Sequence, residues 1–222
     1  MQAKEPIGWL AYDSFTAAEA TVEEAMDRIS VSNLVSADTP LMETAKLYSE
    51  QSPWIFIVLK RNQPLGWISY HSLLGPPFRA CLFGLILAIE QAMAELLKAY
   101  AKFAVSKLPE KRVEAARRVY SLRGYAKWHG KDASDNALID CSNFIDKVTV
   151  IESCPSTLAA LPSFNRSALV RAEAIRNALA HPTPESELVT LLPKQDLHNF
   201  VGWLTSLEAE LASRLRSEDR FA

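Results

Sequence analysis

The residues best suited to chemistry in this chain lie close together near position 180. Arg176, Asn177 and His181 occupy one short segment that runs into Pro182. An imidazole accepts and donates protons near neutral pH, a guanidinium holds a phosphate through two hydrogen bonds, and an amide orients either group. Together they could perform acid–base chemistry next to an anionic group, and no cofactor is expected.

A helix must position these three side chains. Its buried face is predicted by apolar residues at helical spacing, namely Leu169, Ala172, Ile175 and Leu179. Pro182 cannot continue a helix, so we expect His181 at the C-terminus, where the helix dipole and the last unpaired carbonyls favour a cationic imidazole. Asn177 is one turn before His181 on the same face, and Arg176 is displaced by about a third of a turn. The three polar groups are therefore expected at one helix end.

This arrangement, Arg176-Asn177 followed after three residues by His181, resembles the Arg-x4-6-His motif of the HEPN family. The resemblance implies a metal-independent endoribonuclease with RNA as its substrate, products that carry a 2′,3′-cyclic phosphate, and a role in defence, stress or toxin-like RNA cleavage. It also implies an antitoxin-like protein partner. One histidine per chain cannot be both general acid and general base, so two copies across a two-fold axis are expected in a homodimer. A capped, solvated helix end is the alternative interpretation of the motif.

A second pair fits the same spacing. Arg123 and His129 are six residues apart, but Gly124 follows the arginine, and Gly130 with Lys131 follows the histidine. The polar neighbour and the terminating proline are both missing. We therefore expect this pair at the surface, without a catalytic role.

Charge is unevenly distributed along the 222 residues, although the net charge is only −2. Residues 1–52 carry nine acidic and three basic side chains, whereas residues 107–131 carry eight basic and two acidic ones. An anionic partner would bind the second region, for which a solvated helix face is the plainer interpretation. A composition of 49% hydrophobic and 23% charged residues is typical of a globular protein with one or two cores.

Cysteine usage and the hydrophobic segments indicate a cytoplasmic protein. The three cysteines, Cys81, Cys141 and Cys154, show no paired spacing, so neither a metal site nor a disulfide framework is expected. The first residues lack the apolar core of a signal peptide. The most apolar run, residues 80–89, is too short to span a bilayer and predicts a buried helix, so we expect no membrane partner.

The first part of the chain predicts a small α+β module. We expect a short helix at 22–29, an apolar passage at 31–35, a helix at 41–51, strands at 54–59 and 65–70, and a short helix at 71–74. This β-α-β-β order resembles a single CBS domain over residues 22–77. Pairs of such domains bind adenosine nucleotides, but Ser69 and Ser72 stand at the matching positions and the family's acidic residue is missing. Pairing with a second subunit is therefore expected in place of nucleotide binding.

Gly75-Pro76-Pro77 predicts a linker between two domains, because a glycine and two prolines oppose a helix across it. Residues 1–21 would be an N-terminal extension, 22–77 the CBS-like domain and 78–222 an all-α bundle of HEPN type. Five helices are predicted in the bundle, over residues 79–108, 110–128, 137–152, 163–180 and 195–216.

The first bundle helix carries two further expectations. A broad apolar stripe is formed by Ile86, Ile89, Met93, Leu96, Leu97 and Tyr100. Glu90 lies beside this stripe, and by resemblance to the HEPN family it is a candidate for orienting Arg176 or His181, with an exposed helix flank as the alternative. Leu82, Phe83, Leu85 and Leu87 exceed what one core stripe uses and predict a dimer contact. In the third helix, Asp146 and Lys147 are interpreted as a surface pair.

The leading hypothesis is a cytoplasmic two-module protein, CBS-like and then HEPN-like, that acts as a homodimeric RNA endonuclease through Arg176, Asn177 and His181. The competing hypothesis is a catalytically silent adaptor that dimerises or senses a nucleotide. If His181 and Arg176 of two subunits face a common basic cleft, the nuclease is favoured; if these residues lie far apart or are salt-bridged into a wall, the adaptor is favoured.

Overall fold

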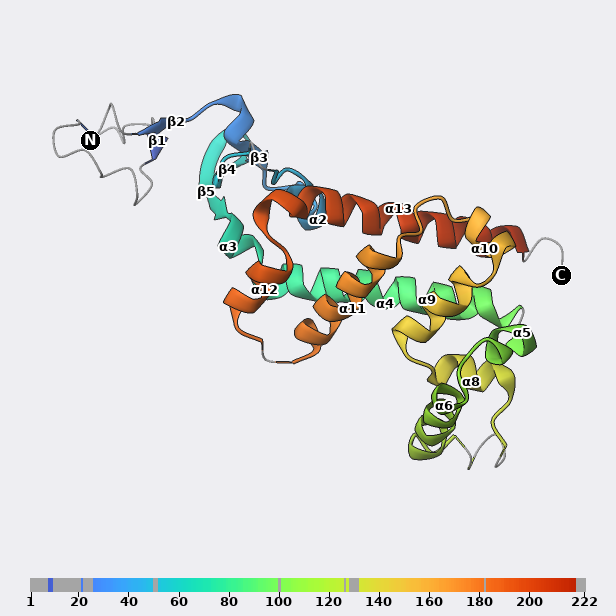
Figure 1. The fold of residues 1–222 in the computed structure, drawn as a ribbon. Coiled ribbons are helices and arrows are strands. Elements are labelled where there is room, and N and C mark those ends of the chain that lie inside the picture. Colours follow the sequence, from blue (N-terminus) through green and yellow to red (C-terminus); the bar gives the residue numbers. More distant parts are fainter. Residues whose placement is uncertain are drawn as a thin grey trace.

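The computed structural model describes residues 8–9, 21, 26–49, 52–99, 101–125, 127, 132–181 and 183–218. The fold is mostly helical, with a small mixed sheet near the N-terminus and two long helices, α4 (Pro76–Lys98) and α13 (Lys194–Glu218), that run side by side along the molecule (Figure 1). Shorter helices pack across α4. The coarse prediction of an α+β part followed by a helical part is therefore confirmed.

The sheet has three strands in the order β3-β4-β5. β3 (Leu34–Ser36) is parallel to β4 (Ile55–Lys60), with α2 (Leu41–Lys46) as the crossover, and β4 is antiparallel to β5 (Gln63–Ser69). The β4–β5 hairpin turns at Arg61 and Asn62, whose φ angles of 51° and 62° give the left-handed turn that matches strand twist. The predicted β-α-β-β order is present.

The expected helix at 22–29 is wrong for the part that the structure describes. Asp27–Arg28 form strand β2, which pairs with β1 (Gly8–Trp9), and residues 22–25 lie outside the described ranges. A single 3-10 turn, η2 (Val31–Asn33), leads into the sheet. Acidic residues leave this stretch little apolar surface to bury, so a helix here would gain little stability from packing on the core.

One face of the sheet joins the hydrophobic core. Val35, Phe56, Val58 and Ile68 lie on this face and pack against buried residues of the helices. Tyr48 donates a hydrogen bond to the carbonyl of Ile68 at 2.9 Å, and Tyr70, at the start of α3 (Tyr70–Leu73), donates one to the carbonyl of Leu192. Burial raises the pKa of the Tyr70 phenol to about 12, so this bond persists across the physiological pH range.

The predicted linker is the start of a helix. Gly75 is the N-cap of α4, and Pro76 and Pro77 occupy its first turn, where the missing N–H groups would have had no intrahelical partner. One cluster of buried side chains extends from Val35 in the sheet to Leu211 in α13. The sheet and the helices therefore share a continuous core.

The helical part contains more breaks than predicted. α4 and α5 (Ala101–Ser106) replace the helix expected at 79–108, and α6 (Glu110–Leu122) follows. The helix expected at 137–152 is divided into α8 (Asp135–Cys141) and α9 (Phe144–Glu152). Then come α10 (Pro155–Ala159), α11 (Arg166–Ala180) and α12 (Glu185–Leu191), of which α12 lies in a stretch expected to be a loop.

Helix α4 is at the centre of this arrangement and contacts α2, α5, α8, α9, α11 and α13. Among the described residues it is the one helix long and apolar enough to cross a membrane, yet its stripe Ile86, Ile89 and Met93 is buried in the core. Leu82 is also fully buried and Leu85 packs against the core, so these two members of the expected dimer contact serve intramolecular packing. Leu87 alone of the four is a large exposed side chain, at 41%.

Candidate functional site

Helix α11 places the predicted arginine and histidine as its sequence indicates. Asn165 caps its N-terminus by accepting a hydrogen bond from the backbone N–H of Ala168 at 3.1 Å. The helix ends at Ala180, and His181 is the C-cap residue, with an extended backbone and an exposed side chain. Thr183 donates its hydroxyl to the carbonyl of Ala178 at 2.6 Å, which satisfies one of the last helix carbonyls. The prediction of a helix that ends at the histidine is confirmed.

The Arg176 guanidinium is held from three sides. Its Nη1 donates to Glu90 Oε2 at 2.5 Å, its Nη2 and Nε donate to Asn177 Oδ1 at 3.0 and 3.3 Å, and its carbon lies 5.6 Å from the centre of the Phe144 ring. Only 20% of the side chain is exposed. Glu90, expected to orient Arg176 or His181, thus contacts the arginine. Described residues engage three of the five guanidinium N–H groups, which leaves two that bind no residue of the described part of the chain.

Glu90 also connects this arginine to a buried lysine. Its Oε1 lies 3.3 Å from Lys147 Nζ, which donates a second hydrogen bond to the carbonyl of Ser142 at 2.6 Å. The Lys147 side chain is only 3% exposed, and burial lowers its pKa, opposed by the charge of Glu90. One carboxylate thus faces two cations, so Glu90, Lys147 and Arg176 form one ionic cluster.

The interpretation of Asp146 and Lys147 as a surface pair is wrong, because both side chains are buried and each binds a different helix. Asp146 receives two hydrogen bonds from Arg112 of α6, at 2.7 and 2.9 Å, and a third from the backbone N–H of Asn143 at 3.0 Å. The last bond belongs to a capping box at the start of α9. The Asn-x-x-Asp spacing at 143–146 was a local signal for that cap, but nothing local indicated Arg112 as the partner of Asp146 or Glu90 as the partner of Lys147.

His181 does not join the arginine cluster. Its ring makes no hydrogen bond or ion pair with any residue that the structure describes, whereas Arg176, Asn177 and Glu90 are in direct contact. A solvent-facing imidazole at the end of α11 is free to meet a ligand or a second subunit. The structure therefore brings Arg176, Asn177 and Glu90 together and leaves His181 exposed at the end of the helix.

The other candidate residues lie elsewhere. Ser69 and Ser72 are engaged with each other as the N-terminal cap of α3, through hydrogen bonds of 2.7 and 3.1 Å between each hydroxyl and the other's backbone N–H. Arg123 is exposed at the end of α6, and His129 lies outside the described residues. Within those residues no three His, Cys, Asp or Glu side chains are grouped as a metal site, and the cysteines Cys81, Cys141 and Cys154 are free thiols.

Comparison with known proteins leaves the site to be judged on its geometry. No protein-family model matches this chain, no curated protein is significantly similar to it, and no solved structure matches its fold.

Proposed function

We propose that this protein is a metal-independent endoribonuclease of HEPN type, preceded by a CBS-like module, and that it acts as a homodimer in the cytoplasm. His181 of one subunit removes the proton from a ribose 2′-hydroxyl, and the same residue of the second subunit protonates the leaving 5′-oxygen. Arg176 stabilises the charge that develops on the phosphorus-bound oxygens, and Asn177 keeps the guanidinium in place. Because the attacking 2′-oxygen belongs to the RNA itself, the product carries a 2′,3′-cyclic phosphate.

The observation that carries this proposal is that the Arg176 guanidinium is held in a fixed orientation while part of it stays accessible. Its guanidinium is fixed by Glu90, Asn177 and Phe144, yet two of its N–H groups bind none of the described residues and the side chain remains partly exposed. A cation that is already oriented loses little conformational freedom when it binds phosphate, so more of its interaction stabilises the transition state. The exposed histidine follows at the end of the same helix.

Incubation of purified protein with end-labelled single-stranded RNA and transfer RNA, in the presence of EDTA, tests the proposal. Cleavage that leaves a cyclic phosphate is expected from the wild type, and Arg176→Lys should lose it because an ammonium cannot make a bidentate contact. The matched control is Arg166→Lys at the first residue of α11, which is exposed and ion-paired with Glu152. Undiminished cleavage by Arg176→Lys, or loss of cleavage in both variants, would contradict the assigned role.

A second function is favoured by the outer face of the sheet. Leu34, Ile57 and Trp67 are directly opposite one another on β3, β4 and β5, on the face away from the core, and Trp67 is 73% exposed. Leu65, on β5, is 66% exposed. An apolar sheet face of this kind suits association with a second copy, for which a standard interface buries about 800 Å² on each partner.

On this alternative the protein is a dimerising adaptor with no catalytic activity. The ion pair between Arg176 and Glu90 supports it, because an arginine engaged in a wall can be purely structural. The EDTA cleavage assay separates the two functions, since the adaptor would dimerise without cutting any RNA. An antitoxin-like protein that covers the His181 end of α11 is expected as a partner of the nuclease, because it would block the active site. An adaptor without activity would need no such inhibitor.

A further inference from the structure

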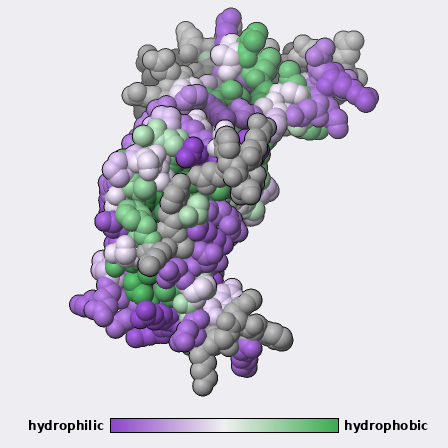
Figure 2. Space-filling view, turned by 90° about the vertical axis from the view of Figure 1, so that its right-hand side faces the viewer, coloured by the Kyte–Doolittle hydropathy of each residue, from purple (hydrophilic) through white to green (hydrophobic). Residues whose placement is uncertain are grey.

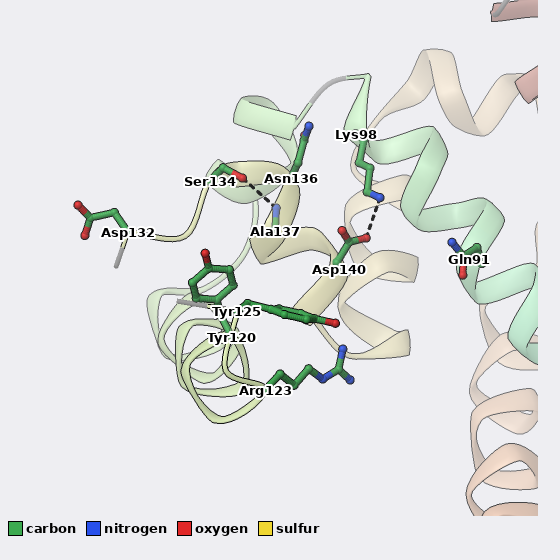
Figure 3. Close-up of a pocket in the computed structure, with 10 residues that line it drawn as sticks. All are labelled: Gln91, Lys98, Tyr120, Arg123, Tyr125, Asp132, Ser134, Asn136, Ala137 and Asp140. Carbon is green, nitrogen blue, oxygen red and sulfur yellow. Dashed lines mark hydrogen bonds and ion pairs between the residues drawn. The ribbon is translucent and has the colours of Figure 1, made fainter. Parts of the chain in front are cut away.

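An open pocket of about 620 Å³ lies apart from the Arg176 cluster, between α4, α8 and the end of α6. Its volume falls in the range of small-molecule sites, roughly 300–1,000 Å³. Figure 3 shows Lys98 of α4 and Asp140 of α8 facing each other, with Tyr120, Tyr125 and Arg123 near the end of α6 and Asp132 pointing outward. The lining residues are Gln91, Lys98, Tyr120, Arg123, Tyr125, Asp132, Ser134, Asn136, Ala137 and Asp140.

The pocket walls can form hydrogen bonds and carry little net charge. Lys98 of α4 is 2.9 Å from Asp140 of α8 (Figure 3), and among the lining residues the two cations, Lys98 and Arg123, are matched by two carboxylates, Asp132 and Asp140. Gln91 and Asn136 add amide groups, each with both donors and an acceptor. Amides and a carboxylate are the groups that pair with the edges of nucleobases, whereas a free phosphate would gain little from so neutral a wall.

Two tyrosines provide an aromatic wall. Tyr120 is buried, and its ring meets that of Tyr125 edge to face, with 5.8 Å between the ring centres. Tyr125 is 36% exposed, so it is both held in position and open to solvent at the pocket. A ring fixed in this way is a platform for an unpaired base, because it loses little freedom when the base stacks on it.

Beside this wall lies the basic surface of α6. Arg123 lines the pocket, and Lys111, Arg117 and Arg118 are exposed on the same helix; none of the four makes an ion pair with a described residue. Hydrophilic residues predominate at the lower end of the molecule in Figure 2, where α6 lies in Figure 1. The buried side of α6, Ala116 and Tyr120, is packed on α8, so these cations face solvent. They can contact phosphates that flank a base in the pocket.

We infer that this pocket holds one unstacked base of a single-stranded RNA, with Arg123 and the exposed cations of α6 on the adjoining phosphates. The inference rests on the proposed function for the nature of the ligand, and it deepens that function by naming the substrate class. A continuous duplex offers no free base to the tyrosine wall. Single-stranded segments, loops or bulges are therefore the substrates, and this second contact fixes where the strand lies relative to the Arg176 cluster.

Equilibrium binding of a fluorescent 12-nucleotide RNA to the full chain tests this inference, with His181→Ala present throughout to prevent cleavage. Tyr125→Leu should weaken binding by about ten-fold, the effect of losing one base stack, whereas Tyr125→Phe should bind normally. Arg123→Gln should reduce the slope of log affinity against log salt by about 0.7, the value for one phosphate on a single strand. The matched control is Arg166→Gln, an exposed arginine on α11, which should change neither quantity.

Equal affinity of Tyr125→Leu and Tyr125→Phe, or equal affinity for the single strand and its duplex, would overturn the pocket assignment. Wild-type cleavage, measured separately, distinguishes this failure from that of the proposed function. If the wild type cuts RNA while the Tyr125 and Arg123 variants bind normally, the pocket assignment falls and the nuclease stands. If binding depends on Tyr125 and Arg123 but no RNA is cut, the pocket assignment stands without the nuclease.

Discussion

Removal of the Glu90 charge is the most informative perturbation of the buried ionic cluster. Glu90 is 19% exposed and is the counter-ion of both Lys147, 3% exposed, and Arg176, 20% exposed. Loss of one partner from a buried ion pair costs about 3–5 kcal/mol, because the remaining charge is left uncompensated. The amide in Glu90→Gln still accepts a hydrogen bond, so we expect a loss of unfolding free energy at the low end of this range, about 3 kcal/mol. At about 2–4 °C per kcal/mol for a chain of this length, Tm should fall by about 6–12 °C.

Urea and thermal unfolding, followed by circular dichroism, measure this loss. The matched control is Glu95→Gln on the same helix, where the carboxylate is 41% exposed and pairs with Lys98 three residues away at 2.9 Å. A surface pair of that kind contributes at most about 1 kcal/mol, so the control should shift Tm only slightly. Equal destabilisation by the two variants would refute the claim that burial makes the Glu90 cluster costly to break.

The same variant has a predicted pH dependence. Burial lowers the pKa of Lys147, while the charge of Glu90 and its hydrogen bond raise it, so Glu90→Gln lowers this pKa further. Between the folded pKa and the unfolded value of about 10.4, the unfolded chain binds more protons at Lys147, and stability therefore rises with pH. This rise in stability with pH is larger in Glu90→Gln, because its Lys147 pKa lies further below the unfolded value. The stability difference from wild type should thus narrow from pH 7 towards pH 10, and a constant difference would show that Lys147 does not titrate in this window.

Three further predictions address the site, its support and the assembly. His181→Ala should reduce RNA cleavage by at least about 100-fold, because a general acid–base group is lost, while Tm stays within about 2 °C; a large fall in Tm would make the residue structural. Arg112→Ala should lower the free energy of unfolding, measured in urea, by about 3 kcal/mol, because the buried Asp146 carboxylate loses its partner. Arg117→Ala removes an exposed cation and should have little effect. Similar losses in the two variants would contradict the importance of the buried pair. Light scattering should give about twice the 24.7 kDa chain mass for wild type and one chain mass for Trp67→Glu, and a monomeric wild type at micromolar concentration would sink the shared-site mechanism.

Several features of this protein follow from local sequence. Helix α11 ends where Pro182 forces it to, its buried face follows the spacing of Leu169, Ala172 and Ile175, and the β4–β5 hairpin turns at Asn62. These features depend on contacts within a few residues, or on whether a side chain faces inward. Periodicity and turn chemistry report both of these properties. The position of His181 at a helix end was therefore predictable.

Local rules were less decisive where they allow two outcomes. Pro76 and Pro77 exclude the interior of a helix but are compatible with its first turn, so the same residues indicated a linker and became the start of α4. Likewise, the surplus of leucines on α4 indicated an outward contact. Leu82 and Leu85 instead found partners within the chain, because α4 is surrounded by six other helices.

Only the tertiary structure determined the partners of the charged residues. Asp146 and Lys147 are neighbours in sequence, but adjacent side chains on a helix point about 100° apart, so Asp146 meets Arg112, 34 residues away, and Lys147 meets Glu90, 57 residues away. Arg176 meets the same Glu90 across 86 residues. Helical spacing specifies which way each of these side chains faces, while its partner depends on how α4, α6, α9 and α11 pack together. Packing of the apolar faces therefore assembled a cluster that no local pattern encodes.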